Sequence, residues 1–185
     1  MKIKVLIFGL LVAFAWNTIE AQTTLSKAQR KKERENAKAI KEKNEEAEWQ
    51  LLKKKIEDKD FVFTGKTING QSLDPKINFL YISDNDAVIQ FANGFGGGLN
   101  GIGGITVKGV IDKYRVSAKK PGKAINVVIT IRPNLGQGVR GPINFNLSAY
   151  SFGSASLGID SNISMMLGEI RSYADSKIFV GNTLN

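Results

Sequence analysis

Three acidic residues near the C-terminus, Asp160, Glu169 and Asp175, could supply a carboxylate pair for hydrolytic chemistry, and a Ser-Lys pair is the other possible source of catalysis. The chain has no histidine and no cysteine, which excludes Ser-His-Asp and Cys-His catalytic groups, disulfide bonds and most zinc and copper sites. A suitably spaced carboxylate pair can cleave a glycosidic bond. One hypothesis is therefore a carboxylate-based hydrolase acting on cell-envelope glycans. The alternative is that these three residues are ordinary acidic side chains on the surface, and we assign no catalytic residue.

The segment from Asn93 to Gly104 holds seven glycines and contains the pattern G-x-G-x-x-G. A dinucleotide site needs a helix directly after this pattern, but here a strand-like run begins at Ile105. No Gly-Lys-Ser/Thr sequence closes the segment, so it is not a P-loop. We expect no cofactor and interpret the segment as a mobile loop between two strands at a barrel rim.

The same segment offers the only ligand contacts that the sequence suggests. If the loop gates the mouth of a barrel, its apolar residues Phe95, Leu99 and Ile102 would touch a small apolar ligand. The acidic run Asp84-Asn85-Asp86 lacks the glycine and glutamate that an EF-hand requires, because Ile89 and Phe95 occupy those positions. We therefore predict a hairpin turn there and no metal site.

The N-terminal residues 1–21 have the composition of a secretory signal peptide. Lys2 and Lys4 precede the apolar run from Val5 to Trp16, and Ala21 is a small residue at the expected cleavage point. The run is too short to cross a bilayer, so we expect no transmembrane segment after cleavage and a periplasmic or secreted protein. Cleavage would leave 164 residues and lower the net charge from +9 to +8, since a net +1 is removed.

Residues 22–59 are predicted to form a long, charged helix. From Ser26 to Lys59 the chain has neither glycine nor proline, and twelve Lys and Arg residues face eight acids. Only Trp49, Leu52 and Ile56 form an apolar stripe at helical spacing. This end should dock on the following domain. We interpret the rest as a solvated helix. The alternative is that its basic side chains bind anionic lipid or polysaccharide.

Residues 60–185 are predicted to form an antiparallel β domain. The runs from Ile125 to Arg132 and from Ile143 to Tyr150 alternate apolar and polar residues, as strands with one buried face do. Weaker alternation and turn sequences such as Asn69-Gly70 and Phe152-Gly153 continue the pattern. We expect a mostly β fold of about eight strands, either a small antiparallel β-barrel or a sandwich.

Together with the predicted signal peptide, three sequence features resemble DUF4251, a family of exported Bacteroidetes proteins of unknown function. These are the charged helix ending in Asp60-Phe61-Val62-Phe63, the glycine-rich loop leading into Gly103-Gly104-Ile105-Thr106-Val107-Lys108-Gly109, and the run Ser151-Phe152-Gly153-Ser154-Ala155-Ser156-Leu157. The resemblance implies a lipocalin-like barrel and brings no established activity.

The leading functional hypothesis is a non-enzymatic binding or structural module of the cell envelope. Its partner would be an unknown envelope component or a small apolar ligand. Nucleic acid is not expected as a partner, because the charged segment lacks the interleaved aromatic residues of a single-strand binder. The glycan hydrolase remains the alternative from a different functional class.

Overall fold

The computed structural model describes residues 26–134, 141–159 and 163–182. The predicted signal peptide 1–21, the first residues of the predicted helix and Asp160 lie outside them. The chain divides into two compact units, the first ending at Lys43 and the second comprising Asn44–Asn185. The elements are helix α2 (Lys27–Glu57), strands β1 (Asp60–Ile68), β2 (Gln71–Ser72), β3 (Phe79–Ser83), β4 (Asp86–Ala92), β5 (Gly97–Gly98), β6 (Ile102–Ala118), β7 (Ile125–Pro133), β8 (Ile143–Ala149), β9 (Ser154–Ile159) and β10 (Ile163–Arg171), and the short helices η2 (Ser151–Gly153) and α3 (Tyr173–Ser176).

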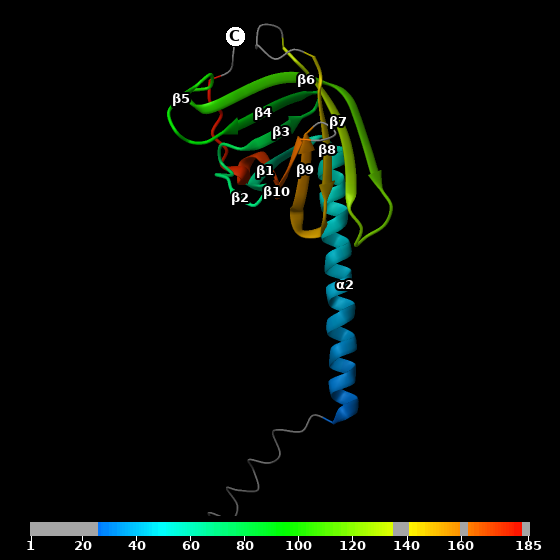
Figure 1. The fold of residues 1–185 in the computed structure, drawn as a ribbon. Coiled ribbons are helices and arrows are strands. Elements are labelled where there is room, and N and C mark those ends of the chain that lie inside the picture. Colours follow the sequence, from blue (N-terminus) through cyan, green and yellow to red (C-terminus); the bar gives the residue numbers. More distant parts are fainter. Residues whose placement is uncertain (1–25, 135–140, 160–162, 183–185) are drawn as a thin grey trace, which may run out of the picture. The chain divides into compact units, whose positions relative to one another are not determined.

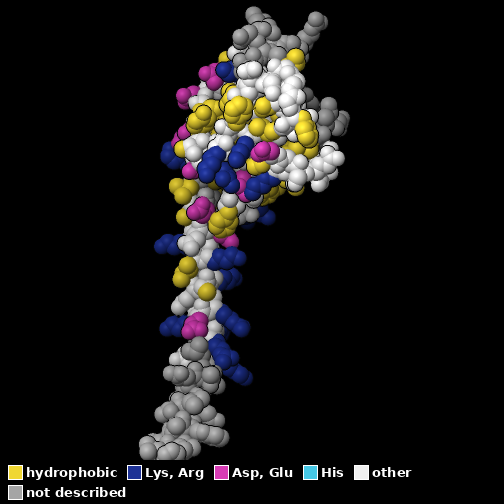
Figure 2. All heavy atoms as spheres, turned by 90° about the vertical axis from the view of Figure 1, so that its left-hand side faces the viewer, with side chains coloured by type: hydrophobic (Ala, Val, Ile, Leu, Met, Phe, Trp, Pro, Cys, Tyr) yellow, Lys and Arg dark blue, Asp and Glu magenta, His cyan; other side chains and the backbone are white. Residues whose placement is uncertain are grey.

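Helix α2 begins with a capping box. The backbone N–H of Gln29 donates to Ser26 Oγ at 3.3 Å, and the Gln29 side chain accepts from the Ser26 N–H at 2.9 Å. The helix ends at Glu57, two residues before the predicted end, and Lys59 follows in the left-handed conformation at φ 53°. Residues 27–43 are exposed throughout, and Lys and Arg side chains are spread along this helix (Figure 2). No helix in the described ranges is long and apolar enough to span a membrane.

Eight strands close into a ring in the order β1, β3, β4, β6, β7, β8, β9, β10 (Figure 1). Closure comes from antiparallel pairing of β10 with β1, in which Phe63 lies opposite Ile170. Every other neighbouring pair in the ring is also antiparallel. Outside the ring, β2 pairs antiparallel with the end of β1, and β5 pairs parallel with β6. The predicted antiparallel barrel is confirmed, and the ring decides against the sandwich.

The interior of the barrel is formed by the apolar face of each strand. Ile129 of β7 lies opposite Phe145 of β8, and both side chains are fully buried. Because pleated strands send alternate side chains to opposite faces, the polar residues between them point outward. The alternation predicted for β7 and β8 is therefore confirmed, with Ile125, Val127, Ile129, Ile131, Phe145, Leu147 and Ala149 all in the buried core.

The C-terminal end of helix α2 packs into this core. Trp49, Leu52 and Ile56 are buried in the same cluster as the strand residues, as their spacing predicts. The Trp49 indole Nε1 donates to the carbonyl of Lys123 in the β6–β7 turn at 2.8 Å. Tyr114 Oη donates to the carbonyl of Ile56 at 2.6 Å, and burial, followed by the nearby Glu57 carboxylate, raises the pKa of Tyr114. The helix is thus fixed at the barrel end where this turn lies.

Replacing Trp49 with alanine tests this attachment. Loss of a buried indole leaves a cavity and an unpaired Lys123 carbonyl, so we expect the free energy of unfolding to fall by about 3 to 5 kcal/mol. The matched control is Gln50→Ala on the exposed neighbouring position, which should change stability by less than about 0.5 kcal/mol. Urea unfolding measures both. Equal effects of the two substitutions would mean that the helix end does not pack on the barrel.

Candidate functional site

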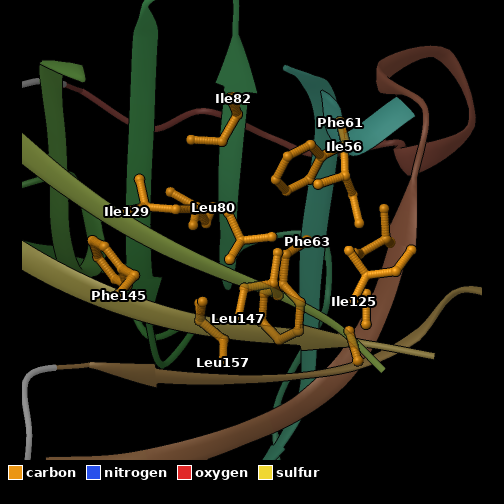
Figure 3. Close-up of a cluster of buried hydrophobic side chains, with 14 of the residues drawn as sticks. Ile56, Phe61, Phe63, Leu80, Ile82, Ile125, Ile129, Phe145, Leu147 and Leu157 are labelled. Atoms are coloured by element: carbon orange, nitrogen blue, oxygen red, sulfur yellow. The ribbon is translucent and has the colours of Figure 1, made fainter. Parts of the chain in front are cut away.

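The barrel interior is occupied by the protein's own side chains. Phe63, Leu147, Leu80 and Ile129 come from different strands and point toward one another, and Ile56 joins them from helix α2 (Figure 3). An eight-stranded barrel is just wide enough for its inward side chains to fill it or for one small ligand, and here the inward side chains form one buried apolar cluster. The apolar side chains that remain exposed, among them Phe95, Leu99 and Phe152, lie outside this cluster.

The glycine-rich segment has a defined backbone arrangement at one rim. Strand β6 begins at Ile102, before the expected Ile105, and β5 (Gly97–Gly98) pairs with it. A Cβ on Gly104 would lie 1.9 Å from the Phe91 carbonyl oxygen, which no side chain tolerates. Glycine at this position permits close approach of two strands. The segment that we interpreted as a mobile loop is thus tied to β6 by specific pairing.

A buried polar network on the outer face of the barrel holds this segment. Asn100, Thr106 and Gln90 are nearly inaccessible. Asn100 Nδ2 donates to Thr106 Oγ1 at 3.2 Å, and Thr106 Oγ1 donates to Gln90 Oε1 at 2.8 Å. The C-terminal segment covers the network, since Gln90 Nε2 donates to the Phe179 carbonyl at 2.8 Å and the Gly181 N–H donates to Gln90 Oε1 at 2.7 Å.

The three predicted ligand contacts do not share one environment. Phe95 and Leu99 are 77% and 63% exposed, so they present apolar surface to solvent. Ile102 is half-buried and lies against Gly181, where an added Cβ would come within 3.3 Å of its side chain. Their role in binding stays a prediction.

The candidate carboxylates have different surroundings. Glu169 accepts hydrogen bonds from Lys66 Nζ and, at 2.6 Å, from Arg171 Nη2. The bonds from Lys66 and then Arg171 hold the pKa of Glu169 below its ordinary value, whereas the general acid of a glycosidase needs a raised pKa. Asp175 accepts from the hydroxyl of Ser172 at the start of α3. Asp160 lies outside the described residues.

The acidic run after β3 forms a turn, as predicted. Ser83 and Asp86 lie opposite each other in the β3–β4 ladder, and Asp84 is left-handed at φ 52°. Within the described ranges, no group of three or more Asp or Glu side chains is placed to hold a metal ion.

The sequence analysis missed a surface pocket of about 230 Å³ between helix α2 and the turn that joins β8 to β9. Leu51 and Phe152 are 63% and 65% exposed at this pocket, and Phe152 is held at φ 63°. The available signal was Leu51, an apolar residue directly beside Leu52 of the buried stripe. The lining residues are Glu48, Leu51, Leu52, Lys55, Phe152, Gly153 and Ile170.

These features define a small antiparallel barrel with a filled interior, a helix packed into one end, and its accessible apolar groups on the surface. The family described as a domain of unknown function, DUF4251, matches residues 28–167, and the chain belongs to this family. The resemblance inferred from the sequence is confirmed.

A crystal structure of a DUF4251 family protein from Bacteroides eggerthii DSM 20697 is similar to this chain. The match has 20% sequence identity and a TM-score of 0.48, and it covers 69% of this chain and 89% of that chain. No curated protein matches the chain.

Asn100→Ala tests whether the polar network orders the glycine-rich segment. The Asn100 side-chain oxygen accepts from the N–H groups of Ile102 and Gly104 at 3.1 and 3.0 Å. Its loss leaves buried polar groups unpaired, so we expect a cost of about 1 to 3 kcal/mol. Hydrogen exchange of the two amides should also accelerate. The exposed Asn146→Ala on β8 is the control and should affect stability by less than about 1 kcal/mol. Fast exchange of both amides in the parent protein would contradict the assignment.

Glu169 should make stability depend on pH at the acid side. A carboxyl with a lowered pKa in the folded state stabilises the fold above its ordinary pKa of 4.5, and this contribution is lost as pH falls through the folded-state value. We expect Glu169→Gln to destabilise at pH 7 and to differ less from the parent at pH 3. Urea unfolding at both pH values measures this, with the exposed Glu46→Gln as control. An equal difference at both pH values would refute the expectation.

Proposed function

We propose that the chain is an exported, non-enzymatic binding or structural module of the cell envelope that acts through its outer surface. The observation that carries this proposal is the filled interior, in which strand side chains and the end of helix α2 form one apolar cluster. An open lipocalin-type barrel keeps space for a ligand inside. A packed barrel instead serves as a rigid scaffold that presents surface groups.

The export part of the proposal rests on the sequence. The basic start, the apolar run from Val5 to Trp16 and the small residue Ala21 support a signal peptide. The absence of cysteine from the whole sequence agrees with a domain stabilised by packing, since no disulfide can form after export. A periplasmic or secreted location follows from these features as part of the proposal.

A small apolar ligand is the second candidate partner. The exposure of Phe95 and Leu99 on the hydrogen-bonded glycine-rich segment favours it, because a backbone held in place reduces the entropy lost when a ligand binds. Ile102 would contribute through its exposed portion. No such specific observation favours the glycan hydrolase, since Glu169 is engaged by Lys66 and Arg171.

Fractionation of an expressing bacterial host, combined with an enzymatic assay, tests the main proposal. The bulk of the protein should lie outside the cytoplasm with Gln22 at its N-terminus. The purified protein should release no soluble sugar from isolated envelope glycans. An intact Met1 terminus on the bulk protein contradicts export. Sugar release that disappears in Glu169→Gln contradicts the non-enzymatic role.

A further inference from the structure

The pocket between helix α2 and the β8–β9 turn combines an apolar floor with projecting apolar groups. Leu52 and Ile170 are buried at its base, while Leu51 and Phe152 remain mostly exposed. Its volume of about 230 Å³ lies below the range of about 300 to 1,000 Å³ for pockets that hold drug-sized ligands. A cavity of about 150 Å³ accepts a benzene ring. The pocket therefore has the size for one or two apolar side chains.

The exposed ring of Phe152 is held there by an unfavourable backbone conformation. Phe152 has φ 63° and Gly153 has φ 79°, so two successive residues are left-handed. A left-handed conformation costs a residue with a Cβ about 1 to 2 kcal/mol. The turn is closed by bonds from the Gly153 N–H to the Tyr150 carbonyl at 3.1 Å and from the Tyr150 N–H to the Ser154 carbonyl at 2.8 Å. An exposed aromatic ring on a strained turn is an observation that points to recognition.

Charges at the pocket form a pattern that is complementary to itself. Glu48, Leu51, Leu52 and Lys55 occupy positions i, i+3, i+4 and i+7, so they lie on one face of helix α2. The two charges are about 10 Å apart along the axis, and their midpoint falls between the two leucines. In the part of the chain that the structure describes, neither charge forms an ion pair or hydrogen bond. A two-fold axis through the midpoint would place each Glu48 opposite the Lys55 of a second copy.

We propose that this surface docks a second copy of the chain in a two-fold symmetric dimer. Each copy has a pocket for an apolar group, and the exposed side chains of Leu51 and Phe152 beside it can enter the pocket of the other copy. Antiparallel crossing of the two α2 helices at the leucines pairs opposite charges on both sides of the axis. Apolar contact provides the affinity, and the charges set the orientation. The proposal is independent of export and of the envelope role.

Charge reversal tests the proposed geometry. The whole chain is expressed in a host that exports it, and the protein purified from that host is examined by sedimentation velocity and native mass spectrometry. Glu48→Lys alone places Lys against Lys, and Lys55→Glu alone places Glu against Glu, so each should raise the dimer dissociation constant at least about tenfold. The double variant restores opposite pairs and should return to within about threefold of the parent. A mixture of the two single variants should form heterodimers, because each Lys then meets a Glu.

Two further variants separate this surface from the rest of the helix. Leu51→Glu removes the apolar contact and should raise the dissociation constant at least about tenfold. Glu46→Lys makes the same charge change on a different helix face and should leave dimerisation unchanged. Circular dichroism verifies that each variant is folded. A monomeric parent at millimolar concentration overturns the proposal. A dimer whose dissociation constant is the same in the parent and in the charge variants also overturns it. Binding of a small apolar molecule in the pocket of a monomeric parent would overturn it as well.

Discussion

The packing of the last turns of helix α2 into the barrel is the interaction on which the rest of the second unit depends. An isolated helix of such polar composition gains little from its own contacts and needs a tertiary partner for its apolar end. The barrel supplies that partner, since Trp49, Leu52 and Ile56 bury against its inward side chains. The two directional bonds, from Trp49 to Lys123 and from Tyr114 to Ile56, fix the last turns of the helix on the barrel. The pocket beside Leu51 exists because this attachment brings the helix against the β8–β9 turn.

A second constraint acts on the outside of the barrel. The Gln90–Thr106–Asn100 network satisfies buried polar groups and joins the glycine-rich segment to the C-terminal residues Phe179 and Gly181. Burial makes each member costly to leave unpaired, so the network favours one backbone conformation over others. The seven glycines therefore lie in a segment whose backbone is held by specific hydrogen bonds. At Gly104, glycine is required because the neighbouring backbone leaves no room for a Cβ.

Because the protein's own apolar side chains form the core of the barrel, both proposed binding surfaces lie on its outside. In the proposed function the barrel is a scaffold, and its exposed apolar groups lie in two different surroundings. Phe95 and Leu99 lie on the ordered glycine-rich segment, whereas Leu51 and Phe152 flank a pocket between two opposite charges. The first arrangement suits a small apolar ligand. The second has a symmetry that suits a copy of the same chain.

Local sequence patterns were sufficient for the elements and for the inward faces. The 3.6-residue spacing of Trp49, Leu52 and Ile56 and the two-residue alternation of β7 and β8 state directly which side chains are buried. The turn at Asp84-Asn85-Asp86 could also be predicted from the sequence, because Asp and Asn tolerate a left-handed backbone.

Three features bring together residues that are about a hundred positions apart in the chain. Strand β10 pairs with β1, Lys66 donates to Glu169, and Leu51 and Phe152 line the same pocket. The sequence by itself determined the helix, the strands and their buried faces, since these depend on neighbouring residues. Only the tertiary structure decided the barrel over the sandwich, the order in the glycine-rich segment and the location of the pocket. Those features depend on contacts whose partners no local periodicity specifies.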